Sequence, residues 1–452
     1  MPEGTTSHSH VFHRDLKATY PVAVTGEGGW IIDREGRRYL DASGGAAVSC
    51  LGHLHPRVVR AIQQQAGTLE FAHTAFFTSE PAEELADFLV SRAPKGFGRV
   101  YFVSGGSEAN EMALKLARQI HVERGEPKRA HNIAREQSYH GNTLGVLALG
   151  GNPARKELYA PLLGLPVSHI VPCYAYRHRR EGESDEAYGL RAAKALEDEI
   201  LKVGPDTVSA FFAETVVGAT AGAVAPAPGY FREIRRICDT YGVLLVLDEV
   251  MSGMGRTGTL YACEQDGVVP DMITTAKGLG AGHQPIGATL VREDLARVIE
   301  RHDGVFRHGH TYIGHPIACA AALETQKVIE DEGLLERVRT AGEMFQDMLV
   351  DRFGQHANVG DIRGRGFFRA VELVADRESK APFPRAKGLA GRIKTHAMAG
   401  GLVCYPGNGT ADGIDGDHVL LAPPFIMSDD ELAMVVDRLE AAIAASLAEV
   451  RA

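Results

Sequence analysis

Residues 230–250 read Tyr-Phe-Arg-Glu-Ile-Arg-Arg-Ile-Cys-Asp-Thr-Tyr-Gly-Val-Leu-Leu-Val-Leu-Asp-Glu-Val, and this stretch decides the fold. Its first part, Tyr230–Tyr241, places apolar residues at helical spacing. Its second part, Val243–Val250, is an almost continuous apolar run. Such a run is typical of a strand that is buried on both faces of a sheet. The stretch therefore predicts a helix followed by a central strand.

The same alternation extends through the middle of the chain. We expect further helices at Ser107–Arg118 and Asp185–Val203, with Ser107 as the cap of the first and Glu108 and Glu111 in its first turn. Alternating strands and helices imply parallel strands with right-handed crossovers, and ligands then bind beyond the carboxyl ends of the strands. Further buried strands are expected at Arg99–Val103, Val208–Thr215, Met272–Ala276 and Gly287–Val291.

The two ends of the chain have a different pattern. Short strands separated by Gly-rich turns are expected near the start, the pattern after Gly309 becomes helical, and a helix from Ser428 to about Val450 closes the chain. We predict an α/β protein in which residues 61–330 form a large domain, while residues 1–60 and 331–452 are the two parts of a small domain. The expected strands of these ends are Val22–Thr25, Trp30–Asp33, Tyr39–Asp41, Val371–Val374 and Val419–Leu421.

Composition excludes several classes of protein. The 452 residues carry a formal net charge of −10, which argues against a broad nucleic-acid-binding surface. The six cysteines are scattered singly, so neither a disulfide framework nor a zinc site is expected, and no metal is predicted. Residues 1–10 are polar and no run of about 18 apolar residues occurs, so we expect a cytoplasmic protein without a membrane partner.

A glycine-rich turn, Ser104-Gly-Gly-Ser-Glu-Ala-Asn110, lies between an expected strand and an expected helix. Glycine lets the backbone approach an oxygen-rich group, and a helix start offers unpaired N–H donors that favour phosphate. Turns of this composition are common, so the motif alone is weak. The chain has no Gly-Lys-Ser/Thr, which removes the ATPase interpretation of Val243–Val250.

Three side chains elsewhere in the sequence could form a site for carbonyl chemistry together with this turn. Lys277 directly follows an apolar strand, and a lysine there is either a solvated surface residue or, when desolvated, an amine that captures carbonyl groups as a Schiff base. Asp248 ends a buried strand and needs a cationic partner, either an arginine or a protonated pyridine nitrogen. Tyr139 is either a core residue or an aromatic face for such a ring.

Taken together, these segments resemble the class III pyridoxal-phosphate-dependent aminotransferases, and the similarity covers nearly the whole chain. This family includes ornithine, acetylornithine, 4-aminobutyrate and ω-amino acid or amine:pyruvate aminotransferases. The motifs that carry the resemblance are Tyr39-Leu-Asp41, Leu51-Gly-His-Leu-His-Pro56, Ser104–Asn110, Ser138-Tyr-His-Gly141, Leu247-Asp-Glu-Val250, Lys277-Gly278, His308-Gly-His-Thr-Tyr312, Gly314-His-Pro316, Arg363-Gly-Arg-Gly366 and Ala422-Pro-Pro424.

The resemblance implies an aspartate aminotransferase-like fold, fold type I, with a mainly parallel central sheet, and pyridoxal 5'-phosphate as cofactor. Lys277 would form the Schiff base, and Asp248 would pair with the pyridine nitrogen. The implied roles of the other cofactor-binding residues are these: Val250 and Tyr139 on opposite ring faces, Gly106 and Ser107 on the phosphate, Thr311 on the phosphate of a neighbouring copy, and Glu214 as a retained family acid. The role of Thr311 implies a homodimer with active sites at the subunit interface, and tetramers are also known in the family.

Departures from the family pattern bear on the substrate. Ornithine and 4-aminobutyrate enzymes have a carboxylate-binding arginine where this chain has Leu420, and a gating glutamate where it has Ala219. Amine:pyruvate enzymes have a movable arginine where this chain has Gly413. We therefore expect recognition of the substrate carboxylate either to come from elsewhere, with Arg363 or Arg365 as candidates, or to be weak. Ala47, in place of an aromatic residue, suggests room for a bulky substrate.

The expected activity is therefore an ω-type transamination between a primary amine or ω-amino acid and a 2-oxo acid such as pyruvate, with ping-pong kinetics. An aminomutase, a racemase or a decarboxylase would share the first steps at Lys277. A non-catalytic relative is the third possibility, and retention of Lys277, Asp248 and Thr311 argues against it.

Overall fold

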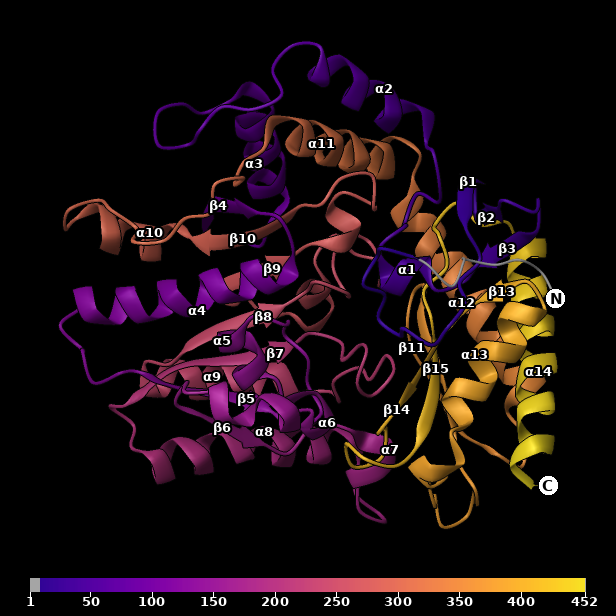
Figure 1. Cartoon of the computed structure of the whole chain (residues 1–452). Helices are drawn as coiled ribbons and strands as arrows, with labels where there is room; N and C mark the ends of the chain where they lie inside the picture. The colour runs from indigo at the N-terminus through magenta and orange to yellow at the C-terminus, as the bar shows by residue number, and fades with distance from the viewer. Residues whose placement is uncertain (1–8, 452) are drawn as a thin grey trace.

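The computed structural model describes residues 9–451. One half of the molecule, on the left in Figure 1, is built around a seven-stranded sheet in which only β10 runs antiparallel to its neighbours. In spatial order the strands are β4 (Phe97–Val103), β10 (Gly287–Arg292), β9 (Met272–Thr275), β8 (Leu244–Asp248), β7 (Val208–Glu214), β5 (His131–Arg135) and β6 (Val167–Ile170). The predicted mainly parallel α/β sheet is confirmed.

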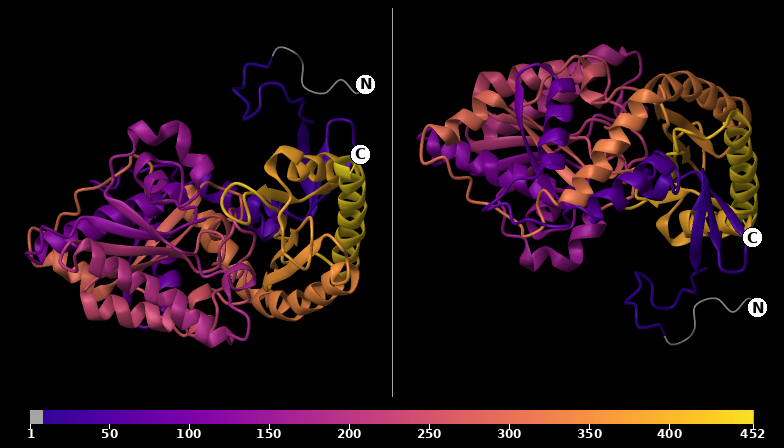
Figure 2. Two further views of the ribbon diagram at one scale, coloured as in Figure 1. Left: turned by 90° about the horizontal axis from the view of Figure 1, so that it is seen from below. Right: turned by 90° about the horizontal axis from the view of Figure 1, so that it is seen from above.

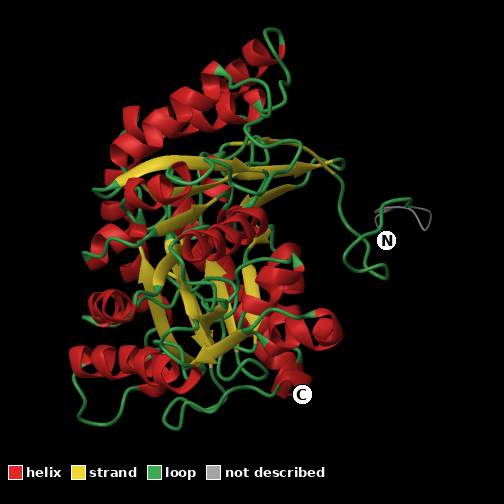
Figure 3. Ribbon diagram, turned by 90° about the vertical axis from the view of Figure 1, so that its left-hand side faces the viewer, coloured by secondary structure: helices red, strands yellow, loops and turns green. Residues whose placement is uncertain are grey.

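Helices cover both faces of this sheet, and the alternation of side chains along the strands explains how. In β7, Phe212 packs toward α4 (Gly106–Glu123), whereas Phe211 belongs to the cluster on the opposite face. Figure 3 shows the strands enclosed between helices. The face of Phe212 also carries α10 (Glu293–Glu300), and the face of Phe211 carries α3 (Glu80–Arg92), α8 (Asp185–Val203), α9 (Tyr230–Tyr241) and α11 (Pro316–Asp331).

The two ends of the chain meet in the other half of the molecule. Strand β13 pairs in parallel with β3, so that Leu402 lies beside Leu40. One sheet consists of β1 (Ala23–Glu27), β2 (Trp30–Asp33), β3 (Arg38–Asp41) and β13 (Leu402–Val403). A second consists of β11 (Val359–Arg365), β12 (Phe368–Leu373), β15 (Asp417–Leu421) and β14 (Tyr405–Asn408).

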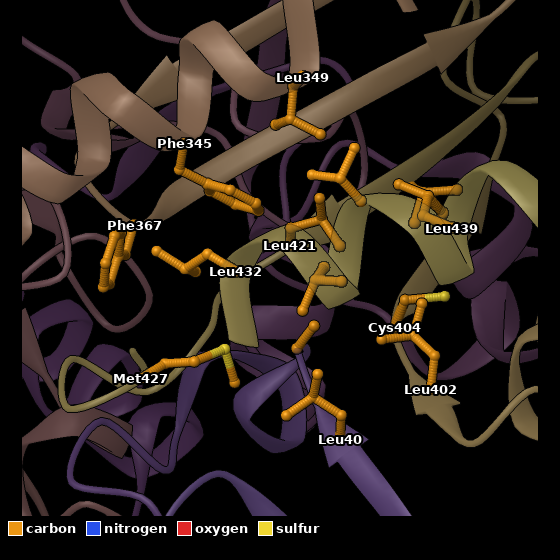
Figure 4. Close-up of a cluster of buried hydrophobic side chains, with 14 of the residues drawn as sticks. Leu40, Phe345, Leu349, Phe367, Leu402, Cys404, Leu421, Met427, Leu432 and Leu439 are labelled. Atoms are coloured by element: carbon orange, nitrogen blue, oxygen red, sulfur yellow. The ribbon is translucent and has the colours of Figure 1, made fainter. Parts of the chain in front are cut away.

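These small sheets pack against three long helices, α12 (Leu334–Phe353), α13 (Leu389–Ala399) and α14 (Asp429–Arg451). Their shared core joins Leu40 near one end of the chain to Phe345, Leu421 and Leu439 (Figure 4). Figure 2 shows α14 on the side of the molecule away from the large sheet. The domain boundaries near residues 60 and 330 stay a prediction.

The remaining elements are one 11-residue helix that packs against α11 and several short helices of three to six residues. They are α1 (Gly44–Ala47), α2 (Pro56–Ala66), α5 (Leu144–Leu149), α6 (Pro153–Lys156), α7 (Ala175–His178), η1 (Glu157–Leu162), η2 (Ala262–Asp266), η3 (Lys277–Leu279) and η4 (Arg385–Lys387). Within residues 9–451, no helix combines the length and apolar character that crossing a bilayer requires.

One predicted detail was wrong. The cap of α4 is Gly105, and the Ser107 side chain does not cap the helix. Its hydroxyl instead accepts a hydrogen bond from the backbone N–H of Asn142 at 3.0 Å. The helix begins at Gly106, one residue earlier than expected, and Gly105 before it has an extended backbone.

Candidate active site

A cavity of about 430 Å³ opens at the carboxyl ends of β8 and β9. This is where an open α/β sheet is expected to bind its ligand. Seven of the predicted site residues line it: Gly106, Ser107, Tyr139, Glu214, Asp248, Val250 and Lys277. They come from five separate segments of the chain, so the fold brings together residues that are up to 171 positions apart in sequence.

Lys277 is the first residue of η3, two residues after the end of β9, and has a positive φ of 46°. Among the described residues, its amine has no hydrogen-bond or ion-pair partner. Burial lowers the pKa of Lys277 to about 8, against the opposing charges of Asp248 and Glu214. Strained backbone and an unpaired, desolvated amine are features of functional rather than surface lysines.

Asp248 ends β8 and is 4% exposed. Its Oδ1 accepts the backbone N–H of Val250 at 2.9 Å. Its Oδ2 accepts the side-chain amide of Asn110 at 2.8 Å and lies 2.8 Å from Nδ1 of His140. These three contacts hold the carboxylate in one orientation at the cavity wall, and no arginine is paired with it. The structural alternative considered for this residue, an arginine partner, is therefore absent from residues 9–451.

Glu214 ends β7 and fixes the loop that carries Tyr139. Its carboxylate accepts the backbone N–H of Tyr139 at 3.1 Å and that of Gly218 at 2.8 Å. Burial raises the pKa of Glu214. The retained acid thus holds Tyr139 at the cavity edge.

The start of α4 offers an anion-binding surface. The N–H groups of Gly106 and Ser107 have no acceptor inside the helix, and the helix dipole favours a negative group there. A Cβ atom on Gly106 would lie 2.8 Å and 2.9 Å from the two methyl carbons of Val250. Only glycine therefore leaves the backbone free to approach a ligand beside Val250.

These residues fit pyridoxal 5'-phosphate, the cofactor that the resemblance implies. One cavity offers an unpaired amine for its aldehyde, a carboxylate for its ring nitrogen and helix N–H groups for its phosphate. Lys277 would hold the aldehyde, Asp248 the nitrogen, and Gly106 and Ser107 the phosphate. Tyr139 and Val250 supply apolar walls for the ring.

The two arginines expected to bind substrate lie away from this cavity, so that expectation needs correction. Arg363 donates to Asp361 at 2.9 Å and to Glu372 at 2.5 Å. Although burial opposes it, the electrostatic effect of Tyr174 and of these two acids raises the pKa of Arg363 above its usual value. Arg365 donates to both carboxylate oxygens of Asp266, at 2.8 Å and 3.0 Å. Both guanidinium groups are already paired with acids and do not line the cavity.

Ala47 and Leu420 are also absent from the cavity lining. Both are buried, at 2% and 0% exposure, in an apolar cluster with Phe368 that includes two cavity-lining residues, Val216 and Met251. They therefore stand behind the apolar wall of the cavity. Ala47 also belongs to a turn with positive φ at each of its four residues, Gly44–Ala47.

Thr311 lies in the exposed segment before α11 and does not line the cavity of its own chain. The expected contact of Thr311 is with a second copy, so its role stays a prediction. Asn110 and His140, in contrast, were not predicted as site residues although both line the cavity. Their position was readable: Asn110 is one helical turn beyond Gly106, and His140 directly follows Tyr139.

Comparison with known proteins agrees with this geometry. The model of the class-III aminotransferase family matches residues 12–443. An uncharacterized aminotransferase of Schizosaccharomyces pombe is 44% identical, over 97% of this chain and 96% of the relative. Probable or named gamma-aminobutyrate transaminases of rice and tomato are 33–36% identical.

Solved structures of transaminases have the same fold. An (S)-enantioselective omega-transaminase from Thermomicrobium roseum is 35% identical, with a TM-score of 0.90 over 98% of this chain and 96% of that chain. An aminotransferase from Vibrio fluvialis in its PMP-bound form is 34% identical, with a TM-score of 0.90 over 98% of this chain and 97% of that chain.

Proposed function

The chain belongs to the class III aminotransferases, which use pyridoxal 5'-phosphate, and from this premise we propose that it is an ω-type enzyme. It moves an amino group between a primary amine or ω-amino acid and a 2-oxo acid such as pyruvate. The observation that carries the transaminase activity is the presence, in one cavity, of a Lys277 amine without a partner and an Asp248 carboxylate held in one orientation.

Each residue has a task that follows from its surroundings. The cofactor, when bound, supplies a carbonyl group for the incoming amine and a ring that stabilises negative charge at the reacting carbon. The Lys277 amine is close to half-protonated near pH 8, so it can both accept and donate a proton at the reacting carbon of the substrate. Asp248 holds a proton at the ring nitrogen, because an ionised carboxylate beside it favours the charged form.

One cavity serves both substrates, so the amine and the 2-oxo acid use it in turn. The carbonyl product of the first half-reaction leaves before the second substrate enters, which gives ping-pong kinetics. We also propose a homodimer in which Thr311 of each copy completes the phosphate site of the other. All six cysteines are buried and free, which fits a reducing compartment and supports a cytoplasmic location.

The ω-type assignment rests on the apolar cluster behind the cavity wall. Leu420 and Ala219 leave no charged pair where ornithine and 4-aminobutyrate enzymes are expected to have one. The similarity to an omega-transaminase structure supports the same assignment.

A panel of primary amines and ω-amino acids, offered with pyruvate or 2-oxoglutarate, tests the proposal on the purified protein. We expect alanine to form from pyruvate, together with the carbonyl product of the amine. Lys277→Ala should abolish both products, whereas Lys327→Ala, which removes a lysine of α11 outside the cavity, should not. If the substrate were racemised, isomerised or decarboxylated and no alanine formed, the protein would be a racemase, an aminomutase or a decarboxylase instead of a transaminase.

A further inference from the structure

The 2-oxo acid of the proposed reaction brings a carboxylate into the cavity. The two arginines that were predicted to bind this carboxylate do not line the cavity. Arg363 is paired with the buried Glu372 and the partly buried Asp361, and Arg365 is paired with the partly buried Asp266. Leu420 is apolar and fully buried. A carboxylate that loses water without a cationic partner would bind poorly. A cation must therefore come from another element near the cavity.

The surroundings of Gly413, the position of the movable arginine in amine:pyruvate enzymes, indicate that this element is α6 (Pro153–Lys156). Gly413 has a φ of 90°, and a Cβ atom there would lie 3.0 Å from Cδ of Pro153, the first residue of α6. A long side chain at position 413 would be strained by its backbone and would collide with α6. The space beside Gly413 is thus taken by α6.

Arg155, in α6, does not line the cavity itself but stacks on a residue that does. Its guanidinium carbon lies 4.5 Å from the ring centroid of Tyr139, which lines the cavity together with Lys277, and its charge acts on Lys277. Among the described residues, no carboxylate is paired with Arg155, and its side chain donates no hydrogen bond. Arg177, in contrast, is paired with Glu372.

Polar contacts hold the backbone of α6 and the loop beside it, whereas the side chain of Arg155 is exposed. Asn152 caps α6 by accepting the backbone N–H of Arg155 at 3.3 Å. Gln137, two residues before Tyr139, donates to the carbonyls of Gly409 at 3.3 Å and Thr410 at 2.9 Å. Because the backbone of Arg155 is fixed and its guanidinium group has no acid partner, the guanidinium group can turn between the ring of Tyr139 and a ligand in the cavity.

We propose that Arg155 is the residue that binds the carboxylate of the 2-oxo acid substrate, an inference that rests on the proposed function. The planar guanidinium binds the carboxylate through two hydrogen bonds while the substrate carbonyl faces Lys277. When an amine without a carboxylate occupies the cavity, the guanidinium remains over the ring of Tyr139. The same site thus accepts charged and uncharged substrates in turn.

Paired ligands that differ only in the carboxylate test this assignment on the cofactor-loaded enzyme. Calorimetric titration with propanoate and with propanamide should show that Arg155→Gln weakens propanoate binding about 10- to 100-fold and leaves propanamide unchanged. In turnover, kcat/KM for pyruvate should fall by a similar factor, whereas kcat/KM for propanal should not. Arg155→Lys should retain part of the pyruvate activity, because it keeps the charge but not the planar fork.

Two control variants sharpen the test. Arg124→Gln removes an exposed arginine at the far end of α4 and should change neither ligand's affinity. Arg14 is the other arginine whose charge acts on Tyr139. If Arg14→Gln, rather than Arg155→Gln, weakened propanoate selectively, the assignment would be wrong.

Other outcomes also decide the question. Equal losses for propanoate and propanamide would show that Arg155 acts only by supporting Tyr139, and unchanged affinity for both would give Arg155 no role; either result overturns the assignment. If the wild-type enzyme made no alanine from pyruvate, the proposed function would fail. The propanoate titration would still decide whether Arg155 binds carboxylates.

Discussion

The Nδ1 atom of His140 lies 2.8 Å from Oδ2 of Asp248, and both side chains are almost completely buried. An ionised carboxylate can only accept, so Nδ1 carries the hydrogen. Asn110 donates to the same oxygen at 2.8 Å and accepts the hydroxyl of Thr274 at 2.9 Å. The chain of hydrogen bonds positions Asp248 before any ligand arrives.

Asp248→Asn should lower turnover by about a hundredfold or more, because the amide keeps the shape but cannot stabilise a protonated ring nitrogen. Asp248→Ala should lose at least as much and leave the oligomeric state of the protein unchanged. Steady-state kinetics and size-exclusion chromatography measure the two effects. Asp294→Asn, on the exposed start of α10, serves as the control and should change neither. Near-normal turnover of both Asp248 variants would refute its role.

His140→Leu should lower kcat about tenfold, because it removes a hydrogen bond to a charged group worth roughly 1.5–3 kcal/mol. His140→Asn retains a donor and should recover most of the lost activity. The visible spectrum of the bound cofactor should shift in the Leu variant and not in the Asn variant. Equal kinetics and spectra for the two variants would show that His140 only fills space.

Burial lowers the pKa of Lys277 to about 8 from its usual 10.5, and this predicts a pH dependence of cofactor uptake. Only the neutral amine attacks an aldehyde. The rate at which the cofactor-free enzyme reacts with pyridoxal 5'-phosphate should therefore rise with pH, with a midpoint near 8, and level off above it. Stopped-flow absorbance measures this rate. A midpoint near 10.5 would mean that the amine is as solvated as a surface lysine.

Much of the large sheet could be predicted because its strands are buried on both faces. The apolar runs at 244–248 and 272–275 stand out for this reason. In contrast, β5 and β6 are short and mix polar with apolar residues, as in His131-Asn-Ile-Ala-Arg135, and were not predicted. The antiparallel direction of β10 was also unpredicted, since an apolar run carries no information on direction.

Some residues of the candidate site could likewise be predicted from the sequence, and others could not. Lys277, Asp248 and the Gly106 turn were readable because each lies at or just after the end of a strand. Arg155 could not be found, because α6 has four residues and no apolar period, and its place beside Tyr139 depends on tertiary packing. Arg363 was misinterpreted because a sequence does not show that Asp361 and Glu372 already neutralise it.

Gly106→Ala should weaken the binding of pyridoxal 5'-phosphate about tenfold. The added methyl group would overlap the methyl carbons of Val250 and push either the helix start or Val250 into the ligand space. Absorbance titration of the cofactor-free enzyme measures the dissociation constant. Gly164→Ala, where nothing lies within 4 Å of the new methyl group, is the matched control. Unchanged affinity of the Gly106 variant would show that this close approach is not needed.

The apolar cluster around Leu420 predicts that 4-aminobutyrate and ornithine are poor amino donors, although gamma-aminobutyrate transaminases are among the relatives. A distal carboxylate near this wall would lose water without gaining a partner. We expect kcat/KM for 4-aminobutyrate to be at least about tenfold below that for butylamine, which has the same chain length without the acid. Initial rates with pyruvate as acceptor measure both values. Equal or better use of 4-aminobutyrate would mean that a cation reaches the distal carboxylate despite Leu420 and Ala219.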